Sequence, residues 1–235
     1  MGIISSTISS HLYFNEKLCI DCCWRFRTMN EKFCMKQFLL VHNKPILLHT
    51  VEKFSKTNLF DKIILVLPSN HRKSWDQIVK DYSFHSNITL VDGGNSRYES
   101  VKNGLKEVDN EGYVAIHDGV RPLVSESLIR KCMNELLENT SAVPSIPLVD
   151  SIRKVNNSVN EIANRNNFRI IQTPQCFHSV LLKKAYEQIE DNEQTDDASV
   201  FEKFGQKIHL IEGEPMNIKI TVASDLLIAE AIING

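Results

Sequence analysis

Short apolar runs alternate with segments of helical periodicity through most of this chain. Lys62–Leu67 (KIILVL) is a continuous apolar run stopped by Pro68, a pattern typical of a strand buried on both faces of a parallel sheet. Pro45 suits the first position of a helix, and the apolar residues after it recur on one helix face. The same reasoning predicts strands at 88–91, 113–116, 142–146, 207–211 and 218–221, and helices at 73–80, 97–108, 126–138, 179–189 and from 224.

This alternation predicts an α/β fold, with a mostly parallel sheet and helices on both of its faces. Ligands of such sheets bind at the carboxyl ends of the strands. Residues 148–172 interrupt the rhythm with extended, polar, Asn-rich sequence, and they are predicted to form a protruding β-arm. Thr195, Asp196 and Asp197 can cap a further helix that contains Ser199, Val200 and Phe204.

Composition narrows the class of protein without identifying its function. The 235 residues, 42% hydrophobic and 24% charged, suit one large domain or one domain with an appendage, and the net charge of −2 argues against a nucleic-acid binder. No run reaches the roughly 18 apolar residues of a membrane span, and no signal peptide opens the chain, so a cytoplasmic location is expected. Met1, Gly2 and Ser6 fit a short myristoylation pattern that is common by chance.

Gly93 and Gly94 come directly after a predicted strand. Glycines there allow a tight turn and close approach of the backbone to a ligand, and Ser96 and Ser100 lie near the start of the next helix, where free N–H groups can bind an anion or a base edge. An ordinary strand-to-helix turn explains the same residues equally well. In isolation, this motif decides nothing.

A stronger motif is the run from His117 to Pro122 (HDGVRP). Asp118 ends a predicted central strand, where a metal–phosphate complex can bind, and Arg121 offers a planar pair of donors. A structural Asp–Arg pair would explain these two residues, but not Gly119 and the strand-end position as well. The motif therefore favours a phosphate site.

Two further motifs are weak by themselves. Thr173-Pro174-Gln175 is a common kind of turn, and Lys219 in the run 217–221 (NIKIT) lies between two isoleucines, so its side chain points away from theirs. That face is either solvent or the floor of an active site.

In this order and spacing, the motifs resemble the 2-C-methyl-D-erythritol 4-phosphate cytidylyltransferases of non-mevalonate isoprenoid synthesis. The similarity covers about residues 29–233 and includes 195–200 (TDDASV), 211–213 (IEG) and 217–221 (NIKIT). The resemblance implies a Rossmann-like nucleotidyltransferase domain over residues 29–235, and a homodimer that exchanges the arm at 148–172. It also implies transfer of a cytidylyl group from CTP to methylerythritol phosphate, with Mg²⁺ as cofactor. Pentitol (ribitol) phosphate cytidylyltransferases share most of these motifs, so ribitol phosphate remains an alternative acceptor.

The resemblance also implies roles for individual residues. Three catalytic cations are Lys36 at the CTP phosphates, Arg165 at the acceptor and Lys219 at the acceptor phosphate. The implied nucleotide-binding residues are Gly93, Gly94, Asn95, Arg97, Ser100 and Gly119. The implied acceptor-binding residues are Asp118, Arg121, Ser151 and Thr173, with Asp118 also at the metal. Ser151 replaces a more usual threonine and keeps the hydroxyl.

The N-terminus departs from the family. The family expects a strand and a glycine-rich loop ending in arginine before Met29, whereas the run from Cys19 to Arg25 reads as neither strand nor helix start. Back-translated with suitable codons and read one base later, residues 15–28 become Met-Lys-Asn-Cys-Val-Leu-Ile-Val-Ala-Gly-Gly-Ser-Gly-Arg. The codons were chosen, but the first glycine follows from Trp24 and Arg25 under any codon choice.

We therefore expect residues 1–28 to be an aberrant, out-of-frame segment, with genuine divergence as the rival explanation. As written, the chain is then either an active enzyme or a folded but inactive dimer. The cysteines at 19, 22, 23, 34, 132 and 176 have no second spaced pair, so free thiols are expected rather than a zinc site.

Overall fold

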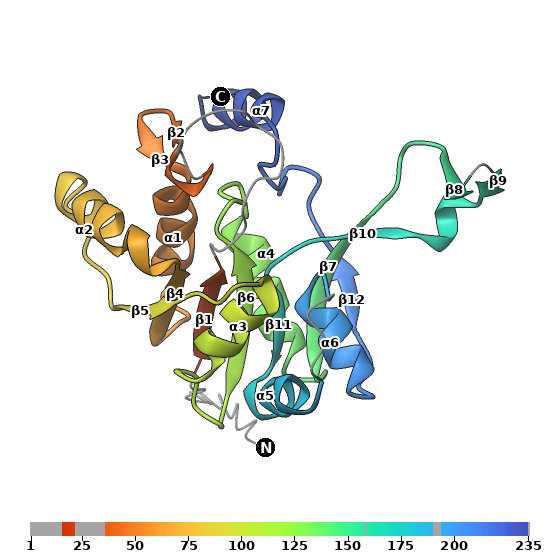
Figure 1. Ribbon diagram of the computed structural model, residues 1–235, viewed down its shortest axis with the longest axis horizontal. Helices are drawn as coiled ribbons and strands as arrows, with labels where there is room; N and C mark the ends of the chain where they lie inside the picture. The colour runs from red at the N-terminus through yellow and green to blue at the C-terminus, as the bar shows by residue number, and fades with distance from the viewer. Residues whose placement is uncertain (1–15, 22–35, 158, 190–193, 235) are drawn as a thin grey trace, which may run out of the picture.

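The computed structural model describes residues 16–21, 36–157, 159–189 and 194–234 of the chain. Its main feature is a sheet in which seven strands follow the order β10-β7-β11-β6-β1-β4-β5, with β12 paired to the outer side of β7 (Figure 1). These strands are β1 (Glu16–Asp21), β4 (Lys62–Leu67), β5 (Ile88–Asp92), β6 (Tyr113–Asp118), β7 (Ser141–Pro147), β10 (Arg169–Ile171), β11 (Gln175–His178) and β12 (Leu210–Glu212).

One half of the sheet is parallel. β1 lies between β4 and β6 and pairs in parallel with both, and Asp21 is in register with Val66 and Asp118. Our expectation that no strand precedes Met29 was therefore wrong, because Glu16–Asp21 forms the central strand. The glycine-rich loop expected after it concerns residues 22–28, which lie outside the described part of the chain.

The sequence pattern failed for β11. This strand runs antiparallel between β6 and β7, and its four residues are too few and too close to the preceding turn to give a period. The run at 218–221 was predicted as a strand and is not one. Its backbone bonds instead to the turn after β6, where Ile220 N donates to Val120 O at 2.9 Å.

Helices cover both faces of the sheet, as predicted. One face carries α1 (Ile46–Thr57), α2 (Arg72–Asp81) and α4 (Glu126–Glu135), which pack on the odd-numbered residues of β4 and β6. The other face carries α3 (Arg97–Leu105), α5 (Ser179–Gln188) and α6 (Asp197–Lys203), which pack on the even-numbered residues of the same strands. Because successive strand residues point to opposite faces, the continuous apolar run of β4 serves both layers. Phe204, expected inside the sixth helix, lies at its C-cap.

A third apolar cluster holds the C-terminus against the body. Helix α7 (Ala223–Asn234) places Ala229 against Val41 and Ile46, beside the small hairpin β2–β3 (Leu40–Val41 and Lys44–Pro45), which the pattern did not predict. A 3-10 turn, η1 (Lys36–Phe38), precedes this hairpin. Within the described residues, no helix is both long and apolar enough to span a bilayer.

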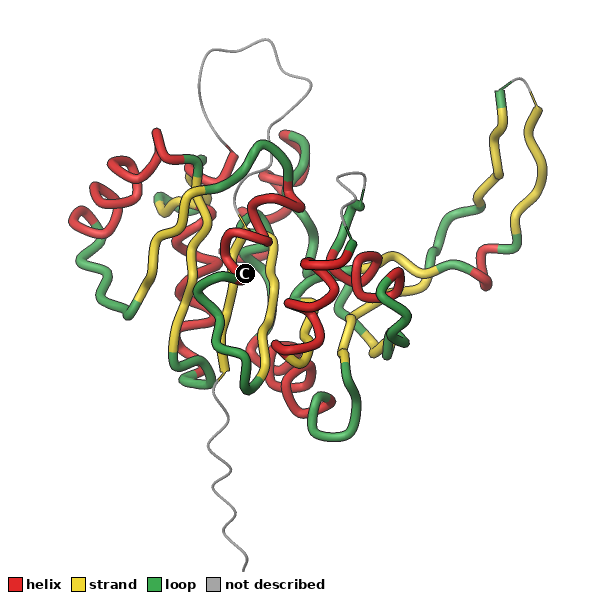
Figure 2. Tube along the Cα trace, turned by 60° about the horizontal axis from the view of Figure 1, so that its bottom comes forward, coloured by secondary structure: helices red, strands yellow, loops and turns green. Residues whose placement is uncertain are grey.

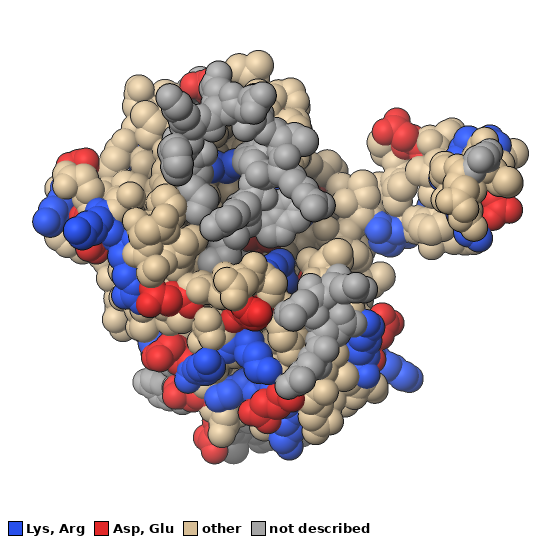
Figure 3. All heavy atoms as spheres, in the orientation of Figure 1, with Lys and Arg blue, Asp and Glu red and all other residues tan. Residues whose placement is uncertain are grey.

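The predicted arm projects from the body (Figures 1 and 2). Its two-stranded tip consists of β8 (Ile152–Asn156) and β9 (Val159–Ala163), followed by the 3-10 turn η3 (Arg165–Asn167). Its surface mixes acidic and basic side chains (Figure 3) with exposed apolar ones, of which Ile162 is 83% and Val155 69% exposed. An arm with this much exposed apolar surface is typical of a segment that packs against another chain.

Candidate functional site

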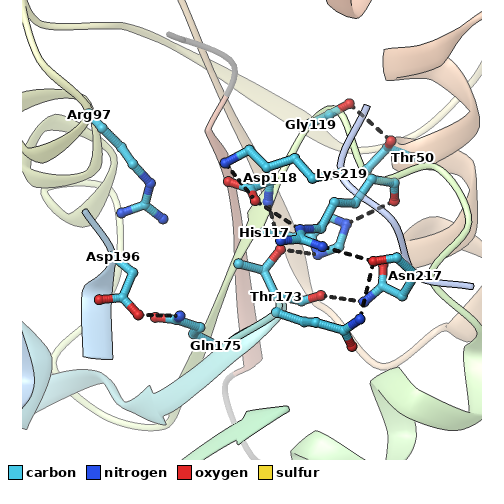
Figure 4. Close-up of polar contacts among 12 residues, drawn as sticks. Thr50, Arg97, His117, Asp118, Gly119, Thr173, Gln175, Asp196, Asn217 and Lys219 are labelled. Atoms are coloured by element: carbon cyan, nitrogen blue, oxygen red, sulfur yellow. Dashed lines mark hydrogen bonds and ion pairs between the residues drawn. The ribbon is translucent and has the colours of Figure 1, made fainter. Parts of the chain in front are cut away.

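Polar side chains from distant parts of the chain meet at the carboxyl end of β6 (Figure 4). They surround a cleft of about 320 Å³. The cleft is lined by Arg97, Asp118, Arg121, Ile171, Gln172, Thr173, Gln175, Thr195, Asp196, Ser199 and Lys219. Five residues predicted from the sequence as site residues are thus brought together: Arg97, Asp118, Arg121, Thr173 and Lys219.

Asp118 is the anionic centre of this cleft. Its Oδ2 lies 2.9 Å from Nε of Arg121 and 3.1 Å from Nζ of Lys219. Burial by itself would raise the pKa of Asp118, but the positive charges of Lys219 and Arg121 outweigh it and hold the pKa well below its ordinary value. One carboxylate thus faces two cations, so the site has positive charge to offer an anionic ligand.

The turn after β6 is fixed on several sides. Arg121 N donates to Asp118 O at 3.0 Å, and Nη1 of Arg121 donates to Asn217 O at 2.8 Å. From helix α1, Oγ1 of Thr50 donates to Gly119 O at 3.0 Å. Gly119, predicted to lie beneath a nucleotide, is therefore held at its carbonyl by a buried hydroxyl.

Lys36 approaches the same region from η1. Lys36 is a buried residue, its ammonium donates to the carbonyl of Thr221, and the carboxylate of Asp225 lies close enough to act on it. Burial lowers the pKa of Lys36 to about 8, the charge of Asp225 opposes this shift, and the charge of Lys219 adds to it. The two predicted catalytic lysines are therefore electrostatic neighbours.

Arg97 forms the opposite wall of the cleft, at the first turn of α3. Its guanidinium makes a two-pronged ion pair with the fully buried Asp197, at 3.1 and 2.6 Å, and Tyr186 Oη donates to the same carboxylate at 2.6 Å. This pair ties α3 to α6. Beside it, Nε2 of Gln175 donates to Asp196 Oδ2 at 2.9 Å, and Asp196 caps α6.

The loop after β5 is shaped by its own helix. Ser100 is fully buried; its hydroxyl accepts from Gly94 N at 3.0 Å and donates to Ser96 O at 2.7 Å. A Cβ on Gly94 would lie 2.3 Å from Cβ of Glu99, so only glycine fits here. Asn95 is exposed, and its N–H bonds to Glu99 Oε2 at 2.7 Å. Gly93, Gly94, Asn95 and Ser100 do not line the cleft itself, and their role at a nucleotide stays a prediction.

The remaining predicted residues lie on the arm. Ser151 and Arg165 are both exposed, and Nη1 of Arg165 donates to the carbonyl of Val149, within the arm itself. The arm projects away from the body of the chain (Figure 1), and neither residue lines the cleft. The structure therefore does not bring these two residues to Asp118 within one chain.

A metal would find few protein ligands in this cleft. Among the described residues, no three His, Cys, Asp or Glu side chains cluster as a metal site. Of the two carboxylates that line the cleft, Asp118 contacts the two cations, whereas Asp196 accepts from Gln175. Mg²⁺ commonly binds through one or two carboxylates together with substrate phosphates and waters, so this donor set suits a metal that arrives with a phosphate ligand.

Several residues of the site were not predicted from the sequence, although they lie within the motifs described above. His117 directly precedes Asp118, Asn217 lies two residues before Lys219, and both are fully buried. Gln175 and Asp197 likewise belong to motifs that had been singled out. Polar residues next to a buried strand or within a site motif are themselves often buried, and buried polar groups require hydrogen-bond partners. Their placement in these motifs was therefore a signal that could have identified them.

Comparisons with known proteins agree on one family. Residues 27–235 match the family model described as 2-C-methyl-D-erythritol 4-phosphate cytidylyltransferase. Proteins with that name from Bacteroides fragilis and Azobacteroides pseudotrichonymphae are 42% and 43% identical over 198 and 202 residues, covering 84% and 85% of this chain and 90% of each relative.

Solved structures give the same result. The 4-diphosphocytidyl-2C-methyl-D-erythritol synthase of Anaerococcus prevotii superposes with a TM-score of 0.81 at 28% identity, over 94% of this chain and 97% of that one. The 2-C-methyl-D-erythritol 4-phosphate cytidylyltransferase of Thermus thermophilus gives 0.74 at 26% identity, over 93% and 98%. The predicted α/β nucleotidyltransferase fold is confirmed.

Proposed function

The chain belongs to the 2-C-methyl-D-erythritol 4-phosphate cytidylyltransferase family, and from this premise we propose that it transfers the cytidylyl group of CTP to 2-C-methyl-D-erythritol 4-phosphate. The products are the CDP-linked methylerythritol and pyrophosphate. The observation that carries the proposal is the meeting of Asp118, Arg121 and Lys219 at the carboxyl end of β6, with Lys36 nearby.

The reaction joins two anions. A phosphate oxygen of the acceptor attacks the α-phosphorus of CTP, a P–O bond forms there, and the bond from the α-phosphorus to the bridging oxygen breaks, so that its electron pair leaves with pyrophosphate. Since the attacking oxygen is already an anion, no general base is needed. Positive charge must instead offset repulsion in the ground state and charge in the transition state.

The chain's own cations suit this task. Lys36, an electrostatic neighbour of Lys219, would bind the CTP phosphates, while Lys219 and Arg121 would bind the acceptor phosphate. Asp118 keeps both of these side chains extended toward the cleft. Arg97, held in place by Asp197, would face the nucleotide with the loop of Gly93, Gly94, Asn95 and Ser100, while Gly119 would lie beneath it.

The acceptor site requires a second chain in this proposal. Ser151 and Arg165 on the arm, together with Thr173 in the cleft, are proposed to hold methylerythritol phosphate. Because the arm projects from its own body, its Ser151 and Arg165 would enter the cleft of a partner copy, giving a homodimer. The exposed apolar residues of the arm, such as Val155 and Ile162, support such a contact.

We further propose Mg²⁺ as cofactor and the cytoplasm as location. The metal would arrive on the CTP phosphates, meet Asp118, and neutralise phosphate charge when bound. The partners of the protein, besides its second copy, would be the two small-molecule substrates, and neither nucleic acid nor a membrane would be involved.

The test is a pyrophosphate-release assay on the purified chain with CTP, Mg²⁺ and either methylerythritol phosphate or ribitol phosphate. Faster turnover with methylerythritol phosphate supports the proposal, and faster turnover with ribitol phosphate assigns the chain to the pentitol-phosphate enzymes instead. No turnover with either acceptor, together with a folded dimer, would support the inactive alternative. Asp118→Asn is the matched negative control, since it keeps the shape of the side chain and removes its charge.

A further inference from the structure

His117 has no role in the chemistry described so far, although it is the residue next to Asp118. It is fully buried near the end of β6, and because strand residues alternate, it lies on the face opposite to Asp118, beneath the turn. Its ring packs against Phe54 of α1, with 4.7 Å between the ring centroids. An imidazole so placed cannot touch a ligand in the cleft, but it can hold the groups that do.

Both ring nitrogens have partners, and these partners fix the tautomer. Nε2 lies 3.2 Å from the carbonyl oxygen of Arg121, which can only accept, so Nε2 carries the proton. The ring is fully buried, and neither of these two partners is a carboxylate that could offset a positive charge, so the neutral form is favoured and Nδ1 has a lone pair. Oγ1 of Thr173 lies 3.0 Å from Nδ1 and must therefore donate to it.

The Thr173 hydroxyl continues the chain of hydrogen bonds. It accepts from Asp118 N at 3.1 Å, and the Thr173 carbonyl accepts from Nδ2 of Asn217 at 2.8 Å. Through these hydrogen bonds the imidazole links both ends of the 118–121 turn and the segment that leads into β11. Asp118, Arg121 and Thr173, which lie at these three points, all line the cleft.

We propose that His117, as its neutral Nε2–H tautomer, is a positioning residue for cytidylyl transfer: it fixes the Asp118–Arg121 turn and orients the hydroxyl of Thr173. This proposal rests on the proposed function for its kinetic readout. One consequence concerns recognition. The Thr173 proton is used by His117, so the hydroxyl offers the cleft only a lone pair and can bind a hydroxyl group of the acceptor but not donate to its phosphate.

The first test is independent of activity. In protein labelled with ¹⁵N-histidine, ring N–H correlation spectra at pH 7.5 report the tautomer of each of the 8 histidines, and the spectrum of His117→Gln assigns the signal. We expect a proton on Nε2 and none on Nδ1. A signal from an Nδ1–H tautomer would overturn the proposal.

The second test uses variants that each keep only one, or neither, of the two hydrogen bonds of His117. His117→Gln places an amide near Nε2 and keeps the bond to Arg121, His117→Asn places one near Nδ1 and keeps the bond to Thr173, and His117→Phe keeps neither. We expect His117→Phe to lower kcat/KM for the acceptor about 100-fold, with the KM for CTP changed less than about 2-fold, and each amide to recover about 10-fold of this loss.

A purely structural role would give a different result. A variant that is only less stable loses kcat in proportion to its unfolded fraction and keeps both KM values, and this outcome for all three variants would overturn the proposal. His178→Gln is the matched control, because His178 also bonds backbone carbonyls, those of Leu136 and Asn139, but lies away from the cleft. If the wild-type protein transfers no cytidylyl group, the proposed function fails, and the tautomer measurement alone decides the role of His117.

Discussion

The ammonium of Lys219 lies 3.1 Å from Oδ2 of Asp118, although Lys219 belongs to an irregular segment near the C-terminus and Asp118 ends a central strand. The same carboxylate oxygen accepts from Nε of Arg121 at 2.9 Å. In the proposed function, both cations would face the acceptor phosphate from positions that Asp118 already fixes. Charges held in place before the substrate arrives need little reorganisation during the reaction.

Lys219→Met is expected to lower kcat about 100-fold, equivalent to about 3 kcal/mol of transition-state stabilisation, because one of the charges that offset phosphate repulsion is lost. Steady-state pyrophosphate release measures the effect. Lys131→Met is the matched control, since Lys131 on α4 is exposed and donates to the Glu212 carbonyl, outside the cleft. Equal losses in both variants would contradict a specific role of Lys219.

Lys36 should set the alkaline limit of kcat/KM for CTP. Its pKa is lowered to about 8, so the free enzyme loses this charge as the pH rises through 8, and kcat/KM should fall there. Lys36→Arg keeps the positive charge at every pH tested and should move the limit to higher pH. An unchanged limit near pH 8 in this variant would assign the titration to another group.

His117 should make the stability of the protein depend on pH. Its pKa is about 4 in the folded protein and 6.5 in the unfolded chain, so between these values the unfolded state takes up the proton and the folded state does not. This residue's contribution is complete above pH 6.5, and between pH 7.5 and 5 it should fall by about 2 kcal/mol.

Urea unfolding of wild type and His117→Gln at both pH values measures this contribution by difference. The variant should lose less stability than wild type on acidification. Parallel losses in the two proteins would show that His117 does not contribute to the acid sensitivity.

Breaking the Arg97–Asp197 ion pair is expected to destabilise the fold strongly, because both side chains are buried. Asp197→Asn removes the carboxylate that faces the buried guanidinium and should cost about 3–5 kcal/mol in the free energy of unfolding. The matched control is the exposed pair Arg72–Asp92, which at 2.7 Å is almost as short as the 2.6 Å of the buried pair. Asp92→Asn should cost less than about 1 kcal/mol, since solvent screens that pair.

The N-terminal segment offers a prediction at the level of the gene. Central parallel strands are normally apolar, as β4 is, yet the sequence of β1 is Glu-Lys-Leu-Cys-Ile-Asp. With the codons considered above, the same stretch read one base later encodes Lys-Asn-Cys-Val-Leu-Ile, which suits that position better. We therefore expect resequencing across codons 15–36 to reveal a one-base insertion or deletion near Thr28. Codons that yield no glycine-rich loop in any frame would leave genuine divergence as the explanation.

The sequence determined those features that depend on local residues. The bounds of β4 were predicted to the residue, because a continuous apolar run between polar ends has only one way to be buried in such a sheet. The positions of Asp118 and Arg121 at the end of β6 were predictable for a similar reason, since a strand end followed by a glycine turn fixes them within a few residues. The arm was recognised by its change of composition.

Only the tertiary structure decided which distant groups meet. Arg97 pairs with Asp197, and Lys36 with Thr221, because the packing of helices on the sheet brings their segments together, and no local pattern encodes that distance. The run at 218–221 illustrates the same limit: its alternation predicts a strand, but its backbone finds partners in the turn after β6 instead of in a neighbouring strand. Alternation specifies which side chains are buried, whereas the hydrogen-bond partner of a backbone depends on what the rest of the chain places beside it.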